Sequence, residues 1–285
     1  MFEKIKIIKR KKDLVPCQHF FIHLKWHEQT VSFGRYGMGV NSFGPLNQYI
    51  DIQEFASQIS PYLHDNGSIL VYIHGFMAHI GFFEKKVGYI LQNQVFNAVE
   101  EQYPIILSLK WESEPDYKES IKAAADKSRL LFETLFALQK ELSKLNISIA
   151  WSWLCHSMGN RIFAQIFTFW LEHKMELKIN RVFLLAADVP SDIFSKELKL
   201  LTHFAQKTYV FKSKSDRTLE IANWIVPYDR LGREGLALKD GFSNVYEIDV
   251  SDIQDHRGLA PRLLKHRYYY ASETIRGYLV KLLKE

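Results

Sequence analysis

The amino-acid sequence predicts an α/β fold in which a mostly parallel central sheet is covered by helices on both faces. From about residue 68, short runs rich in β-branched and aromatic residues alternate with longer segments that carry apolar residues at helical spacing. Several of the short runs are apolar almost without interruption, as is typical of strands buried on both faces. Together these observations favour a parallel sheet over an antiparallel sheet with one face in water.

Six of the short runs are expected to be strands of this sheet. They lie at residues 68–73, 105–111, 147–154, 181–186, 208–212 and 245–250. The clearest helix is expected over residues 117–142, where isoleucine and leucine recur along one face. A terminal helix is expected over residues 272–283, because Ser272 is a suitable N-cap and Glu273 places an acidic side chain in the first turn.

The region before residue 68 is expected to hold antiparallel edge strands and a loop. Residues 20–26 and 30–33 have the composition of two strands joined by a turn. Residues 34–45 are rich in Gly, Asn and Ser and have no clear period, so a loop that leads into the parallel core is predicted there.

The composition fits one globular domain of 285 residues. With 47% hydrophobic residues, the chain has enough apolar surface for one large core. No repeat or flexible linker marks a boundary, so we expect a single domain over residues 1–285, with edge strands and a loop at 1–67 and a core at 68–285. The net charge of +5 is modest and does not favour a nucleic-acid partner.

Basic residues are concentrated near the N-terminus, from Lys4 to Lys12, as a charge run of the kind that is usually solvated. Asp13, Pro16 and Gln18 interrupt the apolar stretch that a secretory signal would need behind those charges. No segment reaches the roughly 18 uncharged apolar residues of a membrane-spanning helix. We therefore expect a cytoplasmic protein with no integral membrane segment.

Cysteine and histidine patterns indicate no metal or cofactor. Cys17 and Cys155 are far apart, which gives neither a disulfide framework nor the paired spacing of a zinc site. None of the eleven histidines lies in a metal-binding spacing such as H-E-x-x-H. A protein without metal or cofactor is therefore expected.

The strongest local signal surrounds Ser157, in the sequence WLCHSMGN at 153–160. It follows an expected strand and leads directly into an apolar helical segment, which is the context of a nucleophile elbow. Such a turn strains the serine backbone and presents its hydroxyl above the carboxyl edge of the sheet, with the backbone N–H of Met158 aimed at a developing oxyanion. Cys155 replaces the usual first glycine, and it is small enough for the turn to form. The alternatives are an ordinary turn serine and Cys155 as the nucleophile, although Cys155 occupies the strand end and not the tip of the turn.

The expected strand at 68–73 ends in His74 and Gly75, which supports a second half of the oxyanion hole. A turn at this point brings a backbone N–H to the mouth of the site, and we assign that donor to Phe76 or Met77. We expect His74 and Gly75 to lie beside the substrate, although a histidine at such a position more often braces the loop by hydrogen bonds.

A serine nucleophile requires a base to take its proton and an acid to orient that base. Asp216 is the favoured acid because it follows a strand and precedes a helical segment. Asp188, one strand earlier, is the runner-up. His266 is the favoured base because it lies between the last strand and the last helix, but His256 shares that connection and stays an alternative.

Taken together and in order, these motifs resemble the bacterial α/β-hydrolases of unknown function, relatives of the lipase and esterase superfamily. The resemblance covers about residues 68–283 and is carried by the His-Gly strand end, the elbow, and the segments LKWES at 109–113, LAADV at 185–189 and SDRTL at 215–219. It implies the α/β-hydrolase fold, with Ser157 as nucleophile, Asp216 as acid and His266 as base. Cys155 and Glu112, where the family generally has Gly and Pro, depart from the pattern.

The predicted activity is hydrolysis of a small carboxylic ester or thioester through an acyl-enzyme. Apolar residues near the predicted loops favour an apolar acyl group; they are Phe76, Met77, Ile80, Phe82, Phe83 and Trp224. Residues 191–206 and 227–241, the longest stretches between expected elements, are candidates for a lid. The alternative is an inactive scaffold of the same fold that binds a small ligand or a protein partner.

Overall fold

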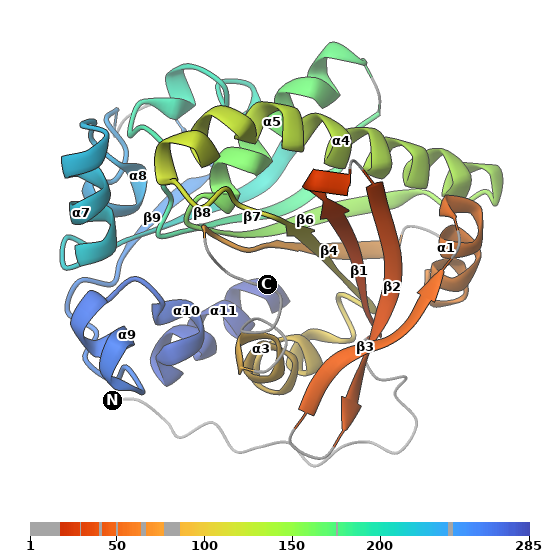
Figure 1. Cartoon of the computed structure of the whole chain (residues 1–285), viewed down its shortest axis with the longest axis horizontal. Helices are drawn as coiled ribbons and strands as arrows, with labels where there is room; N and C mark the ends of the chain where they lie inside the picture. The colour runs from red at the N-terminus through yellow and green to blue at the C-terminus, as the bar shows by residue number, and fades with distance from the viewer. Residues whose placement is uncertain are drawn as a thin grey trace.

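Nine strands form one sheet within the part of the chain that the structure describes. This computed structural model describes residues 18–28, 30–39, 42–49, 51–63, 67–76, 86–174, 176–238 and 242–285. The strands follow one another across the sheet in the order β3-β2-β1-β5-β4-β6-β7-β8-β9. Figure 1 shows the sheet between two layers of helices.

Most of the sheet is parallel. The strands are β1 (Gln18–Lys25), β2 (Thr30–Gly39), β3 (Ser42–Tyr49), β4 (Gly67–Ile73), β5 (Ile105–Trp111), β6 (Ile149–His156), β7 (Ile179–Leu185), β8 (Ala205–Lys212) and β9 (Val245–Asp249). Each pair of neighbouring strands in the run β1-β5-β4-β6-β7-β8-β9 is parallel. Only the pairs β1–β2 and β2–β3 are antiparallel. The expected α/β class with a mostly parallel sheet is confirmed, and each of the six expected core strands is present.

Side chains of the central strands alternate between two cores, one on each face of the sheet. In β4, Ile69 and Val71 pack into one core while Leu70 and Tyr72 pack into the other. All four side chains are buried, as the two-residue period of a strand covered on both faces requires. This burial explains why the sequence of β4 is apolar without alternation.

The helices divide between the two faces. They are α1 (Ile52–Ile59), α3 (Gly88–Gln94), α4 (Tyr117–Lys144), α5 (Gly159–Glu172), α6 (Leu201–Phe204), α7 (Arg217–Ile225), α8 (Leu231–Glu234), α9 (Leu259–Leu264), α10 (Tyr268–Ala271) and α11 (Glu273–Lys284). Residues of α1, α4 and α5 cover one face, and residues of α3, α10 and α11 cover the other (Figure 1). Ser272 caps α11 as expected, since its Oγ accepts a hydrogen bond of 3.1 Å from the Ile275 N–H.

The N-terminal strands extend the sheet further than the sequence predicted. The expectation of a loop over residues 34–45 was wrong, because β2 continues to Gly39 and β3 begins at Ser42. Gly34 explains part of the error: a Cβ there would lie 2.3 Å from the Phe21 ring and 2.3 Å from the Asn47 carbonyl oxygen. Glycine permits this close approach of strands, so it does not mark a loop here. In addition, β1 is an internal strand between β2 and β5, not an edge strand.

Among the helices that the structure describes, none combines the length and apolar character required to cross a membrane.

Candidate active site

Ser157 lies on a strained turn between β6 and α5. Its φ angle is +54°, in the left-handed region of backbone conformation that residues other than glycine rarely adopt. Hydrogen bonds hold this conformation: the Ser157 N–H donates to the Leu185 carbonyl at 2.9 Å, and the Ser157 carbonyl accepts from the Asn160 side-chain amide at 2.9 Å and from the Asp188 N–H at 3.2 Å. The surrounding contacts therefore impose the strain, as in a nucleophile elbow.

Two glycines allow the elbow to approach the end of β4. A Cβ on Gly159 would lie 2.6 Å from the carbonyl oxygens of both Ile73 and His74. A Cβ on Gly75 would lie 2.7 Å from the Ser157 Cβ. Backbone therefore packs directly against backbone at this point, and the turn after β4 lies beside the Ser157 side chain.

Cys155 occupies the position where the family pattern has glycine. Its side chain is fully buried and belongs to the core that packs against α4 and α5. Burial raises the pKa of the Cys155 thiol well above its usual value, so the thiol stays protonated and is a poor nucleophile. The tip of the turn is occupied by Ser157 instead.

His266 and Asp216 form a buried hydrogen-bonded pair. The His266 Nδ1 donates to the Asp216 Oδ2 at 2.7 Å, and both side chains are buried. The other carboxylate oxygen, Oδ1, accepts from the Leu219 N–H at 2.9 Å and so caps α7. Because Nδ1 carries the proton, the neutral imidazole has its lone pair on Nε2, which is the atom that a general base uses.

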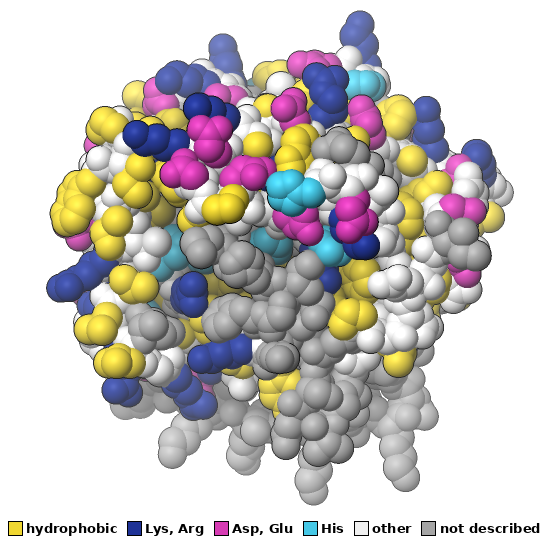
Figure 2. Space-filling model, viewed as in Figure 1, with side chains coloured by type: hydrophobic (Ala, Val, Ile, Leu, Met, Phe, Trp, Pro, Cys, Tyr) yellow, Lys and Arg dark blue, Asp and Glu magenta, His cyan; other side chains and the backbone are white. Residues whose placement is uncertain are grey.

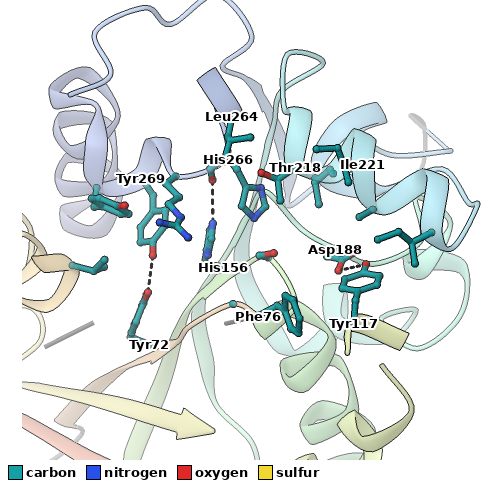
Figure 3. Close-up of a pocket in the computed structure, with 18 residues that line it drawn as sticks. Tyr72, Phe76, Tyr117, His156, Asp188, Thr218, Ile221, Leu264, His266 and Tyr269 are labelled. Carbon is teal, nitrogen blue, oxygen red and sulfur yellow. Dashed lines mark hydrogen bonds between the residues drawn. The ribbon is translucent and has the colours of Figure 1, made fainter. Parts of the chain in front are cut away.

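His156 supports the loop that carries His266. Its Nε2 donates to the His266 carbonyl oxygen at 3.1 Å (Figure 3), and its ring centroid lies 4.3 Å from that of Tyr269. Burial is the main cause that holds the pKa of His156 well below 6.5, and the proximity of His266 is the second. This ring is therefore neutral. In the elbow pattern, His156 occupies only the variable position before the serine. Its partner is 110 residues away in the chain, and no local pattern signals that contact.

The two alternative triad residues have other partners. The Asp188 carboxylate accepts hydrogen bonds from Arg230 Nε at 2.8 Å, from the Tyr117 hydroxyl at 2.6 Å and from the Tyr228 hydroxyl at 3.0 Å. Arg230 is itself buried, so Asp188 neutralises a buried cation. The His256 backbone pairs with Ser272, and His256 does not line the pocket at Ser157. The geometry therefore favours Asp216 over Asp188 and His266 over His256.

The residues expected near the oxyanion differ in their positions. Phe76 lines the pocket, Met158 is buried at the start of α5, and Met77 lies outside the described residues. His74 braces the turn: its Nδ1 donates to the Gly75 carbonyl at 2.9 Å, its Nε2 accepts from the Trp111 N–H at 3.2 Å, and its ring stacks on the Trp111 ring. Gly75 lines the pocket, whereas His74 does not.

A cavity of about 280 Å³ opens beside Ser157 and His266. Figure 3 shows His266 between two walls, with Tyr72 and Tyr269 on one side and Phe76 and Ile221 on the other. The second wall is largely apolar and includes four α7 residues, namely Leu219, Ile221, Ala222 and Ile225. The first wall carries the hydrogen-bonded hydroxyls of Tyr72 and Tyr269, 2.9 Å apart.

The walls come from segments other than those expected to form a lid. None of the described residues of 191–206 or 227–241 lines the cavity. In the first of these segments, Phe194 and Leu201 are buried in the main core instead. The cavity is bounded by α7 and by the region from Leu264 to Tyr270. Among the apolar residues expected near the site, Trp224 lies on α7 but outside the cavity, and Ile80, Phe82 and Phe83 lie outside the described residues.

The described residues contain no group of three or more His, Cys, Asp or Glu side chains that could hold a metal ion. Cys17 lies outside the described residues.

A family model described as an α/β hydrolase of unknown function (DUF900) matches residues 52–284, a range that contains all three candidate triad residues. This match confirms the resemblance drawn from the motifs. Among solved structures, a "putative cell surface hydrolase" from Lactobacillus plantarum WCFS1 is similar at 13% sequence identity, with a TM-score of 0.39 over 76% of this chain and 98% of that chain. No curated protein matches the chain.

Proposed function

Because this chain belongs to the α/β-hydrolase family DUF900, we propose that it is a serine hydrolase that cleaves carboxylic esters or thioesters. The observation that carries the proposal is the combination of a strained Ser157 with a His266–Asp216 pair on the same cavity. A strained serine alone has many structural explanations. A buried carboxylate that orients an imidazole toward the same cavity is the arrangement that acyl transfer requires.

In the first half of the reaction, Ser157 Oγ attacks the carbonyl carbon while His266 Nε2 takes the hydroxyl proton. Asp216 stabilises the imidazolium that forms, through the hydrogen bond to Nδ1. The negative oxygen of the tetrahedral intermediate accepts hydrogen bonds from the backbone N–H groups of Phe76 and Met158. The intermediate then expels the alcohol or thiol, which leaves with the proton from His266, and an acyl ester on Ser157 remains.

In the second half, water attacks the acyl-enzyme. His266 takes a proton from the water, and the acyl–oxygen bond to Ser157 breaks as the proton passes to Ser157 Oγ. The carboxylic acid leaves and the enzyme returns to its starting state. The neutral form of His266 is required at the start of each half, because only neutral imidazole can accept a proton.

The cavity supports a substrate with an apolar acyl group. Four α7 side chains and Phe76 supply an apolar wall, and the cavity volume of about 280 Å³ suits a small molecule. The opposite wall, with its tyrosine hydroxyls, suits the more polar leaving group. Under this proposal the acyl group lies along α7.

The test is a panel of p-nitrophenyl esters of increasing chain length, together with labelling by a fluorophosphonate. Wild-type protein is expected to hydrolyse the esters and to be labelled, and Ser157→Ala is expected to lose both. Cys155→Ala is the matched control, because it removes the neighbouring thiol and keeps the serine. A folded wild type that shows neither turnover nor labelling would leave a binding scaffold as the better account.

A further inference from the structure

Exposed apolar side chains are concentrated on the two helices beside the cavity. On α7, Ile221, Trp224 and Ile225 are 44%, 77% and 42% exposed, and on α9, Leu259 and Leu263 are 75% and 56% exposed. Spacings of three and four residues place each set on one face of its helix. These five residues, which we call the apolar rim, are five of the eleven exposed large hydrophobic side chains in the described part of the chain.

The apolar rim is continuous with the cavity. Ile221 and Ile225 also line the cavity, and so does Leu264, which follows Leu263 in α9. The two helices contact each other, so the five residues of the rim lie on adjoining elements beside the cavity. An apolar group that leaves the cavity along α7 would therefore meet the rim next. Figure 2 shows hydrophobic side chains gathered at the edge of the molecule where Figure 1 places α7 and α9.

Basic side chains flank the apolar rim. Residues 258–267 contain Arg262, Lys265 and Arg267 and no acidic residue, and Arg217 is exposed at the start of α7. Glu220, the acidic residue within α7, lies 3.8 Å from Arg233. The surface around the cavity mouth thus combines exposed apolar groups with positive charge, a pattern typical of surfaces that bind anionic membranes.

Trp224 strengthens this interpretation. Tryptophan is favoured at membrane–water interfaces, where its ring lies among the lipid headgroups. Exposed contiguous apolar side chains are unusual on soluble proteins unless they bind something. The rim consists of two short helix faces beside the cavity and not one closed groove, which suits the surface of a lipid layer from which a chain can enter the cavity.

We propose that the apolar rim docks on a lipid surface that carries anionic headgroups, and that the hydrolysed ester comes from that surface. The second part rests on the proposed hydrolase function, and the first part does not. Docking removes the rim from water and opens a path for an acyl chain from the lipid layer into the cavity. The flanking cations add attraction to anionic headgroups, which salt weakens.

The experiment measures cosedimentation of the whole chain with vesicles made of equal parts phosphatidylcholine and phosphatidylglycerol. The Trp224→Ser/Leu263→Ser variant removes two apolar rim side chains that do not line the cavity, and we expect at least a tenfold weaker partition to vesicles. The control variant, Leu46→Ser/Leu145→Ser, removes two exposed leucines outside α7 and α9 and should bind as wild type does. Vesicles of phosphatidylcholine alone should bind wild type more weakly.

Tryptophan fluorescence gives a second readout. Of the six tryptophans, Trp224 is the highly exposed one, so vesicle addition should shift the emission to shorter wavelength in wild type and not in Trp224→Phe. All variants keep the basic run from Lys4 to Lys12. Equal vesicle binding by the rim variant and wild type would therefore assign binding to other basic groups and overturn the proposal, as would failure of wild type to bind.

Three further outcomes separate the parts of the proposal. A dimer in sedimentation velocity that Trp224→Ser abolishes, without vesicle binding, would assign the apolar rim to a second copy of the chain and refute lipid docking. Turnover of soluble esters without rim-dependent vesicle binding refutes docking and leaves the hydrolase. Rim-dependent vesicle binding without fluorophosphonate labelling refutes the hydrolase and leaves docking.

Discussion

Replacement of Asp216 by Asn tests whether the buried carboxylate fixes the tautomer of His266. In the structure, Oδ1 of Asp216 caps α7 and Oδ2 accepts the Nδ1–H of His266 at 2.7 Å. Asparagine can keep the cap through its amide oxygen, and it is as good an N-cap as aspartate. Its amide nitrogen, however, places a donor opposite Nδ1. The imidazole then carries its proton on Nε2 and cannot accept the serine proton.

The expected loss follows from this change of tautomer. The analogous exchange in other Ser-His-Asp enzymes lowers kcat by about 10⁴-fold, which corresponds to about 5 kcal/mol of lost transition-state stabilisation. The free energy of unfolding should change by less than about 1 kcal/mol, because the cap persists and a buried charge is removed. Activity and stability therefore separate in this variant.

The assay compares kcat on a soluble p-nitrophenyl ester with urea unfolding for Asp216→Asn and Asp188→Asn. The second variant leaves the Arg230 guanidinium buried without its carboxylate, and we expect it to lose about 3–5 kcal/mol of stability. A fully active Asp216→Asn, together with an inactive but folded Asp188→Asn, would refute the assignment of the acid.

Three further predictions concern packing, pH and the support of the base. Gly159→Ala should lower the free energy of unfolding in urea by several kcal/mol, because its Cβ would lie 2.6 Å from carbonyl oxygens at the end of β4. Gly277 has open space around it, so Gly277→Ala should instead stabilise α11 by about 0.5–1 kcal/mol. Burial lowers the pKa of His19 to about 3, so below pH 6.5 the unfolded chain binds a proton that the folded chain excludes. His19 alone should therefore lower the unfolding free energy by about 2 kcal/mol between pH 6.5 and 4.5, a loss that His19→Asn should reduce and that a flat wild-type profile would contradict. His156→Phe removes the donor to the His266 carbonyl and should lower kcat on soluble esters about tenfold. His156→Gln keeps an N–H donor, so kcat should recover in this variant. An equal loss of kcat in both variants would exclude the hydrogen bond as the cause.

Local sequence patterns predicted the features that depend on local geometry. The elbow at Ser157 follows from a strand, a small residue, a serine and a glycine in order, because the turn itself requires these residue types. The apolar runs predicted the parallel core strands, because burial on both faces removes the polar alternation. Asp216 and His266 were predicted as acid and base from their places after strands, since the carboxyl ends of parallel strands meet at one edge of the sheet, and the structure brings the two side chains to within 2.7 Å of each other.

Other features depend on contacts between distant segments. The glycine at position 34 indicated a loop, but its neighbours Phe21 and Asn47 belong to adjacent strands that the sequence does not identify as partners. The support that His156 gives to the His266 loop spans 110 residues. The two candidate lid segments, residues 191–206 and 227–241, were also chosen incorrectly, because the length of a segment says little about which one lies beside the serine. Tertiary packing decides these features.

The two buried aspartates near the elbow lie in different environments, and this difference supports Asp216 as the proposed acid. Asp188 and Asp216 both follow strands of the sheet, and the sequence pattern alone does not separate them. The Asp188 carboxylate accepts hydrogen bonds from two phenol hydroxyls and a guanidinium. Burial, and to a smaller extent the charge of Asp188, raises the pKa of Tyr228 to about 12, so this phenol stays a hydrogen-bond donor. Asp216 instead accepts one backbone N–H and the imidazole of His266. A carboxylate whose remaining partner can titrate is the one that can support proton transfer, whereas a carboxylate paired with a permanent cation holds the wall of the site in place.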